Sequence, residues 1–104
     1  MYARNLAIHL KPSAGPEFTK TIERDVLPVL RKQNGFKDEL TFMNPDGKRA
    51  IAISLWDKKE SADAYAGSAY AGVLKSMDKV VEGIPEIQSY EVSNSTFHKI
   101  SSKS

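Results

Sequence analysis

The sequence predicts an α+β domain whose elements follow the order β-α-β-β-α-β. Apolar residues alternate with other residues over 2–11 and 49–56, as they do in strands. They recur every three or four residues over 16–34 and 59–82, as they do in amphipathic helices. A turn sequence precedes 49–56 and follows a further strand-like segment, 36–43. This order is the ferredoxin-like plan, a four-stranded antiparallel sheet with both helices on one face.

Length, charge and composition narrow the classes of function. With 104 residues, 40% of them hydrophobic, the chain fits one core, which we place in residues 1–97, followed by a flexible tail, 98–104. The absence of cysteine excludes disulfides, thiolate metal sites and cysteine nucleophiles. A formal charge of +2 gives no argument for nucleic acid, and neither a membrane span nor a signal peptide is recognisable. We therefore expect a soluble cytoplasmic protein without nucleic-acid or membrane partners.

The first strand, 2–11, is expected to be covered on both faces. Leu6, Ile8 and Leu10 recur at a spacing of two and share one face. The other face carries small or mixed residues rather than a row of charges, namely Ala3, Asn5, Ala7 and His9. Such a strand is typical of a sheet without a solvated face.

The first helix is expected to begin at Pro16 and to end at Asn34-Gly35. Its apolar side chains fall four residues apart, at Phe18, Ile22, Val26 and Leu30. Pro28 removes the hydrogen bond to the Arg24 carbonyl, so we expect a kink or a local distortion there.

The segments 36–43 and 49–56 are expected to pair as an antiparallel hairpin. Between them lies Asn44-Pro45-Asp46-Gly47, in which proline and glycine occupy usable turn positions. The second of these strands alternates large and small residues and ends at Trp56.

The second helix, 59–82, is expected to break into two pieces between Gly67 and Gly72, because both glycines weaken it. Gly83 and Pro85 are expected to end it. The last strand is then predicted over 87–97.

One sheet face is left without a cover in this arrangement. The strands 2–11 and 49–56 carry apolar side chains on both faces, but the two helices cover only one. An uncovered apolar surface of this size is usually buried against a partner. We therefore predict a homodimer joined sheet to sheet.

Several chemistries lack a signature in the sequence. The two histidines, His9 and His98, are far apart and have no second ligand at metal-binding spacing, so no metal site is predicted. No nucleophile elbow or phosphate loop is present. The strand 49–56 has no aromatic residue before Trp56, which leaves no platform for stacking RNA bases. A small-ligand regulatory module of the ACT type shares the strand order and stays open.

Aromatic and amide side chains form the candidate ligand site. Each of the aromatic residues also fits a plain core role. A buried tyrosine nevertheless needs a partner for its hydroxyl, which favours a site at Tyr65 and Tyr70. An apolar cleft with a few polar groups between helix and sheet suits a flat aromatic ligand. The candidate residues are Asn5, Phe36, Phe42, Trp56, Tyr65 and Tyr70.

Short motifs over residues 2–97 resemble the antibiotic biosynthesis monooxygenase superfamily. They are Lys11-Pro12, Glu17-Phe18, Gly35-Phe36, Ile53-Ser54-Leu55-Trp56 and Glu60-Ser61-Ala62-Asp63-Ala64-Tyr65. The resemblance implies a dimeric α/β barrel, in which two sheets meet face to face and the helices lie outside. That arrangement agrees with the apolar residues on both faces of the strands.

The superfamily includes cofactor-free oxygenases of polyketide-like phenols, quinol monooxygenases, haem-degrading enzymes and proteins without demonstrated chemistry. The haem-degrading members use an asparagine on the first strand, then a tryptophan and a histidine on the second helix. Asn5 matches the first of these, but Tyr65 and about Lys75 stand at the other two positions. Without an axial histidine on this helix, haem degradation is not expected.

The cofactor-free members imply a site that binds a flat phenol or quinol, removes its proton and lets the anion reduce oxygen without a cofactor. We expect His9, Asn5 and Tyr65 to be catalytic, with His9 as the base. Two alternatives remain open: a non-catalytic dimer that binds a small apolar ligand or serves a stress response, and an isomerase or lactonase-like reaction. The expected substrate-binding residues are Phe36, Phe42, Trp56 and Tyr70.

Overall fold

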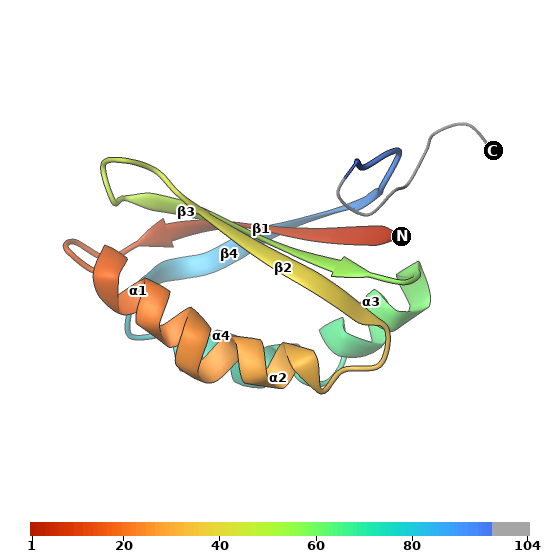
Figure 1. Cartoon of the computed structure of the whole chain (residues 1–104). Coiled ribbons are helices and arrows are strands. Elements are labelled where there is room, and N and C mark those ends of the chain that lie inside the picture. Colours follow the sequence, from red (N-terminus) through yellow and green to blue (C-terminus); the bar gives the residue numbers. More distant parts are fainter. Residues whose placement is uncertain (97–104) are drawn as a thin grey trace.

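The computed structural model describes residues 1–96, so Phe97 and the predicted tail, 98–104, lie outside the described residues. One antiparallel sheet has the strand order β2-β3-β1-β4, and the helices lie together on one side of it (Figure 1). The predicted ferredoxin-like α+β fold is confirmed. The strands are β1 (Tyr2–Leu10), β2 (Phe36–Met43), β3 (Arg49–Trp56) and β4 (Val81–Glu91).

The first helix contains a π-helical turn. It consists of α1 (Gly15–Thr21), the π-helical segment η1 (Ile22–Val26) and α2 (Leu27–Arg31). The Leu27 N–H bonds to the Ile22 carbonyl five residues back. Pro28 has no N–H and its ring crowds the preceding turn, so a regular α-helix cannot pass through this position. The predicted distortion is confirmed and takes the form of a π-turn.

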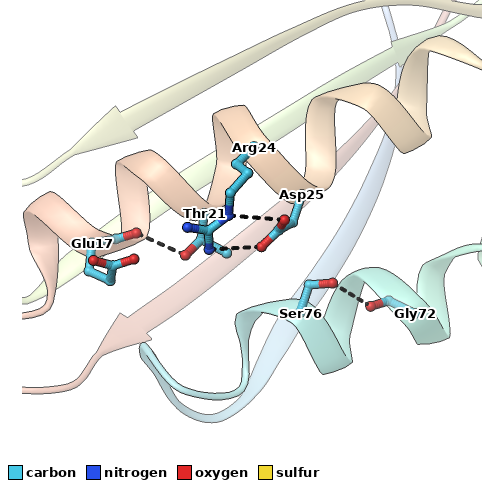
Figure 2. Close-up of polar contacts among 6 residues, drawn as sticks. All are labelled: Glu17, Thr21, Arg24, Asp25, Gly72 and Ser76. Atoms are coloured by element: carbon cyan, nitrogen blue, oxygen red, sulfur yellow. Dashed lines mark hydrogen bonds and ion pairs between the residues drawn. The ribbon is translucent and has the colours of Figure 1, made fainter.

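Local hydrogen bonds satisfy hydroxyl groups on the two main helices (Figure 2). The buried Thr21 hydroxyl donates to the Glu17 carbonyl at 2.9 Å, so it needs no partner in the core. On the other helix the Ser76 hydroxyl donates to the Gly72 carbonyl at 3.0 Å. The exposed Arg24–Asp25 ion pair beside Thr21 contributes little to stability, as surface pairs usually do.

The second helix is divided, as predicted, into α3 (Lys59–Ala66) and α4 (Tyr70–Met77). The chain turns between them at Gly67, where the α3 cap lies. Because of this turn, the last inward residue of α3, Tyr65, and the first residue of α4, Tyr70, are both buried.

The expected boundary between this helix and the last strand is wrong. The helix ends at Met77 rather than at 82, and β4 begins at Val81 rather than at 87. The strand is described as far as Glu91, short of the predicted end at 97. Val81 is buried in the strand, and an apolar residue at the end of a helix is expected to be buried as well. Its apolar character therefore does not distinguish a helix from a strand. Gly83, with φ of +72°, falls where the β1–β4 register shifts and so marks a bulge in the strand.

The two sheet faces differ in cover. Toward the helices the sheet buries a core whose largest fully buried side chains are Trp56, Phe18, Ile8 and Met77. The opposite face, which we call the open face, bears no helix (Figure 1). Its exposed apolar side chains are Leu40, Phe42, Ile51 and Tyr90. Within residues 1–96, no helix is long and apolar enough to cross a membrane.

Candidate functional site

A small internal cavity lies between the sheet and the helices. Its volume is about 30 Å³, room for roughly two water molecules. Its walls are apolar except at Glu39, Ser54 and Tyr65. Two of its apolar residues, Ile22 and Val26, come from the π-helical segment. The full lining is Leu6, Ile22, Val26, Leu30, Glu39, Ala52, Ser54, Tyr65, Val73 and Met77.

Tyr65 belongs to a cluster of four aromatic rings and brings this cluster to the cavity wall. Trp56 stacks on Tyr65 with ring centroids 5.0 Å apart and an angle of 28° between the planes. Tyr65 in turn contacts Tyr70 at 5.8 Å, and Phe36 meets Trp56 edge to face at 5.6 Å. The buried Trp56 Nε1 donates to Ser54 Oγ at 2.9 Å, which fixes the indole. The packed rings hold Tyr65 in place at the cavity wall.

Arg4 is buried beside the two tyrosines, and no carboxylate among residues 1–96 forms an ion pair with it. Its side chain is only 3% exposed, and its guanidinium carbon lies 4.1 Å from the Tyr70 ring centroid and 5.7 Å from that of Tyr65. The rings offset part of the cost of burying the charge through cation–π attraction. Within residues 1–96, neither Arg4 Nε nor the Tyr70 hydroxyl has a hydrogen-bond partner.

Glu39, Ser54 and Arg4 form a polar row across three strands. Glu39 pairs with Ser54 between β2 and β3, and Ser54 pairs with Arg4 between β3 and β1. Directly paired residues project to the same face of a sheet, here the face under the helices. Burial raises the pKa of the Glu39 carboxyl, and the nearby charge of Asp38 raises it further. The Thr41 hydroxyl donates to Glu39 Oε2 at 2.6 Å and acts in the opposite direction.

Both tyrosines of the cluster hold their protons tightly. Burial raises the pKa of the Tyr65 hydroxyl to about 12, against the opposing effect of the Arg4 charge. Burial also raises the pKa of Tyr70, again opposed by Arg4. At neutral pH both phenols are therefore protonated and act as hydrogen-bond donors rather than as bases.

The raised pKa of Tyr65 predicts a loss of stability in alkali. The unfolded chain releases this proton near pH 10, whereas the folded chain retains it to about pH 12. The stabilising effect is therefore complete below pH 10 and is lost as pH rises toward 12, at up to about 1.4 kcal/mol per pH unit. Urea denaturation from pH 9 to 12 should show a steeper loss of stability in the wild type than in Tyr65→Phe, in which only the raised pKa of Tyr70 still contributes. Tyr90→Phe, at a half-exposed position, should keep the wild-type slope, and equal slopes in all three proteins would contradict the assignment.

The structure brings together four of the residues expected at the site. Trp56, Tyr65 and Tyr70 are buried, and Phe36, which is partly buried, closes the edge of the cluster. Tyr65 is the one of these four that lines the cavity.

The structure does not bring Asn5, His9 and Phe42 to this site: they lie apart from the tyrosines, on the other face of the sheet. Successive residues of a strand point to opposite faces, and Arg4 and Leu6 occupy the helix side of β1. Asn5 and His9 therefore lie on the open face, where His9 is exposed and the Asn5 Oδ1 is buried without a hydrogen-bond partner in the described part of the chain. Phe42 is 53% exposed on the same face.

Three polar residues of the site, Arg4, Ser54 and Glu39, were not predicted from the sequence. Arg4 keeps the spacing of two with Leu6, and Ser54 keeps it with Trp56, so the phase of each strand could have indicated both. Glu39 gives no such signal, because β2 is partly exposed along its whole length and has no consistent apolar face.

Metal and haem do not fit the residues that the structure describes. Within residues 1–96, no group of three or more potential ligands could hold a metal ion. His9 is the one histidine in this range, and it faces away from the cavity. Lys75, which stands at about the position of the histidine ligand in the haem-degrading proteins, is exposed. His98 lies outside the described residues.

Comparison with known proteins gives matches in structure but not in sequence. No family model and no curated protein matches the chain. ActVA-Orf6 of Streptomyces coelicolor, a monooxygenase solved with nanaomycin D, superposes with a TM-score of 0.77 at 12% identity, over 90% of this chain and 88% of its own. SnoaB of Streptomyces nogalater, a cofactor-independent oxygenase, gives 0.73 at 14% identity, over 91% and 95%.

A third similar structure is a variant of MhuD with two manganese protoporphyrin IX molecules bound per active site. It gives a TM-score of 0.76 at 19% identity, over 92% of this chain and 98% of its own. At these identities the similarity concerns the fold. The resemblance indicated by the short sequence motifs is thus confirmed at that level: the chain shares its fold with solved proteins of the antibiotic biosynthesis monooxygenase type, among them those of Bordetella bronchiseptica and Nitrosomonas europaea.

Proposed function

We propose that this protein is a cofactor-independent monooxygenase of a small phenolic, quinol or polyketide-like aromatic. The observation that carries the proposal is the apolar cavity with Tyr65 at its wall and Trp56 stacked on Tyr65. Two of the proteins with this fold are themselves a monooxygenase and a cofactor-independent oxygenase.

The reaction needs little from the protein beyond binding, exclusion of water and proton control. An electron-rich phenolate or anthrone anion reduces oxygen by itself. With an anthrone, the CH₂ carbon becomes a carbonyl, since O₂ supplies that oxygen atom and its second atom leaves as water with both hydrogens. Tyr65, protonated at neutral pH, can donate a hydrogen bond to the oxyanion of the substrate. A ring needs more than 30 Å³, so its entry must displace apolar side chains of the cavity wall.

We also propose that a second copy of the chain covers the open face. Phe42 and Ile51, neighbours across β2 and β3, are 53% and 40% exposed there. Close to them on the same face, Asn5 Oδ1 is buried without a hydrogen-bond partner in residues 1–96. A second sheet packed on this face would bury the apolar side chains and complete the barrel.

The function is tested by measuring oxygen uptake with an anthrone and a quinol. We expect uptake with at least one of them, and a roughly 100- to 1000-fold lower kcat in Tyr65→Phe, because one donor to the oxyanion is lost. The matched control, Tyr90→Phe, changes an exposed tyrosine outside the cavity and should keep full activity. A ligand that binds under oxygen and is recovered unchanged would instead favour the non-catalytic binding protein. Full activity in Tyr65→Phe would remove this residue from the mechanism.

A further inference from the structure

We propose that Glu39 is the catalytic base. It takes a proton from a neutral phenol, quinol or anthrone in the cavity and leaves the substrate there as an anion. This inference rests on the proposed function. It assigns the base to β2, on the helix side of the sheet, and not to His9, which lies on the open face.

Position carries the assignment. Glu39 is the acidic residue among those that line the cavity, whose other polar members are Ser54 and Tyr65. Tyr65 is protonated at neutral pH, and a serine hydroxyl without an adjacent base does not accept a proton. Glu39 is therefore the cavity residue suited to proton abstraction.

The surroundings of Glu39 strengthen its carboxylate as a base. The apolar wall destabilises its ionised form, which makes the carboxylate a stronger base than one in water. Thr41 restrains this effect through its hydrogen bond, and Asp38 strengthens it. From α3, Tyr65 faces Glu39 in its neutral form.

Glu39 also has a route to solvent. It borders a hollow on the outer surface, next to α2, in addition to the cavity. The cations of that hollow are Arg31 and Lys37, both on the solvent side. A proton taken from the substrate inside can thus leave toward water outside, which restores the carboxylate for the next turnover.

The charges of the site balance before and after the transfer. The substrate X–H bond breaks and the Glu39 carboxylate gains an O–H bond, so the negative charge moves from Glu39 to the substrate. The total charge of the substrate together with the row of Glu39, Ser54 and Arg4 is therefore unchanged. Arg4, buried and without a counter-ion in the described residues, then attracts the new anion from behind Tyr65.

This balance defines the substrate class. The site accepts neutral molecules with one weakly acidic O–H or C–H group, such as a phenol, a quinol or an anthrone. Aromatic carboxylates, already charged at neutral pH, are repelled by Glu39 and should bind poorly.

The test uses 4-nitrophenol without oxygen, because this probe is colourless as a phenol and yellow as a phenolate. We expect its apparent pKa to fall by at least one pH unit on binding to the wild type. In Glu39→Gln, which keeps the shape of the side chain, this shift should be lost while far-UV circular dichroism stays unchanged. Glu23→Gln, a control at an exposed helix position, should keep the shift. Thr41→Val removes the restraining hydrogen bond and should enlarge it.

The outcomes separate this inference from the proposed function. If the wild type ionises the probe and Glu39→Gln does not, the role of Glu39 as base is supported. If, in addition, no substrate gives oxygen uptake, the proposed monooxygenase activity is excluded. Oxygen uptake that survives in Glu39→Gln overturns the base and leaves the monooxygenase intact. A probe that is never ionised by the wild type also overturns the base.

Discussion

Replacing Gly35 by alanine is expected to destabilise the fold by about 2–5 kcal/mol. Gly35 has φ of +81°, where a side chain costs about 1–2 kcal/mol. A Cβ there would also overlap the side chains of Asp57 and Ser61, which hydrogen-bond each other at 2.6 Å. Because the overlap includes Ser61 Cβ, the start of α3 itself must shift, at a further cost of about 1–3 kcal/mol. Urea denaturation followed by circular dichroism measures the change.

Gly47→Ala provides the matched control for this experiment. Gly47 has a similar φ of +72°, but a Cβ added there meets nothing within 4 Å. Its substitution should therefore cost only the conformational part, about 1–2 kcal/mol. Equal losses at the two positions would show that the contact with Asp57 and Ser61 does not matter.

The second large effect is expected at the open face. Ile51→Asp places a charge in the middle of the proposed dimer interface, twice in a symmetric pair. Burying an unpaired carboxylate costs several kcal/mol per copy, enough to separate the two chains at micromolar concentration. Light scattering should give twice 11.5 kDa for the wild type and 11.5 kDa for the variant.

Ile87→Asp is the control for this substitution. Ile87 is 44% exposed, close to the 40% of Ile51, but it pairs with Leu6 and so lies on the helix side of the sheet. It should leave the dimer intact. A wild type of 11.5 kDa, or an Ile51→Asp variant of unchanged mass, would exclude the open face as the interface.

Most of the fold could be predicted because apolar spacing and turn residues report local geometry directly. The spacing of two in β1 and of four around Phe18 and Ile22 assigned their elements. The boundary at Val81 could not be predicted in this way. An apolar pair followed by Gly83 fits both the end of a helix and a bulged strand, and only the pairing with β1 decides between them.

The site was predictable where it is apolar and not where it is polar. Trp56, Tyr65 and Tyr70 were expected in the cavity region because large aromatic residues are mostly buried. Arg4 and Glu39 have side chains that composition assigns to the surface, and their burial depends on cross-strand neighbours. Asn5 and His9 were chosen for their chemistry, although the phase of the strand placed them on the opposite face.

The π-turn at Ile22–Val26 bears on how this cavity could change over evolution. A π-turn contains one residue more than the α-helical turn it replaces, so it records an insertion tolerated by the helix. Losing that residue would rotate everything that precedes it by about 100° relative to α2. Phe18 and its neighbours would leave the core as a group, so such a deletion requires compensation elsewhere. Moving the extra residue along the helix by one position would instead exchange only the side chains that the π-turn presents to the cavity, now Ile22 and Val26. Such a shift would change which side chains line the cavity, and so which ligands it accepts, without any change in the sequence of the sheet.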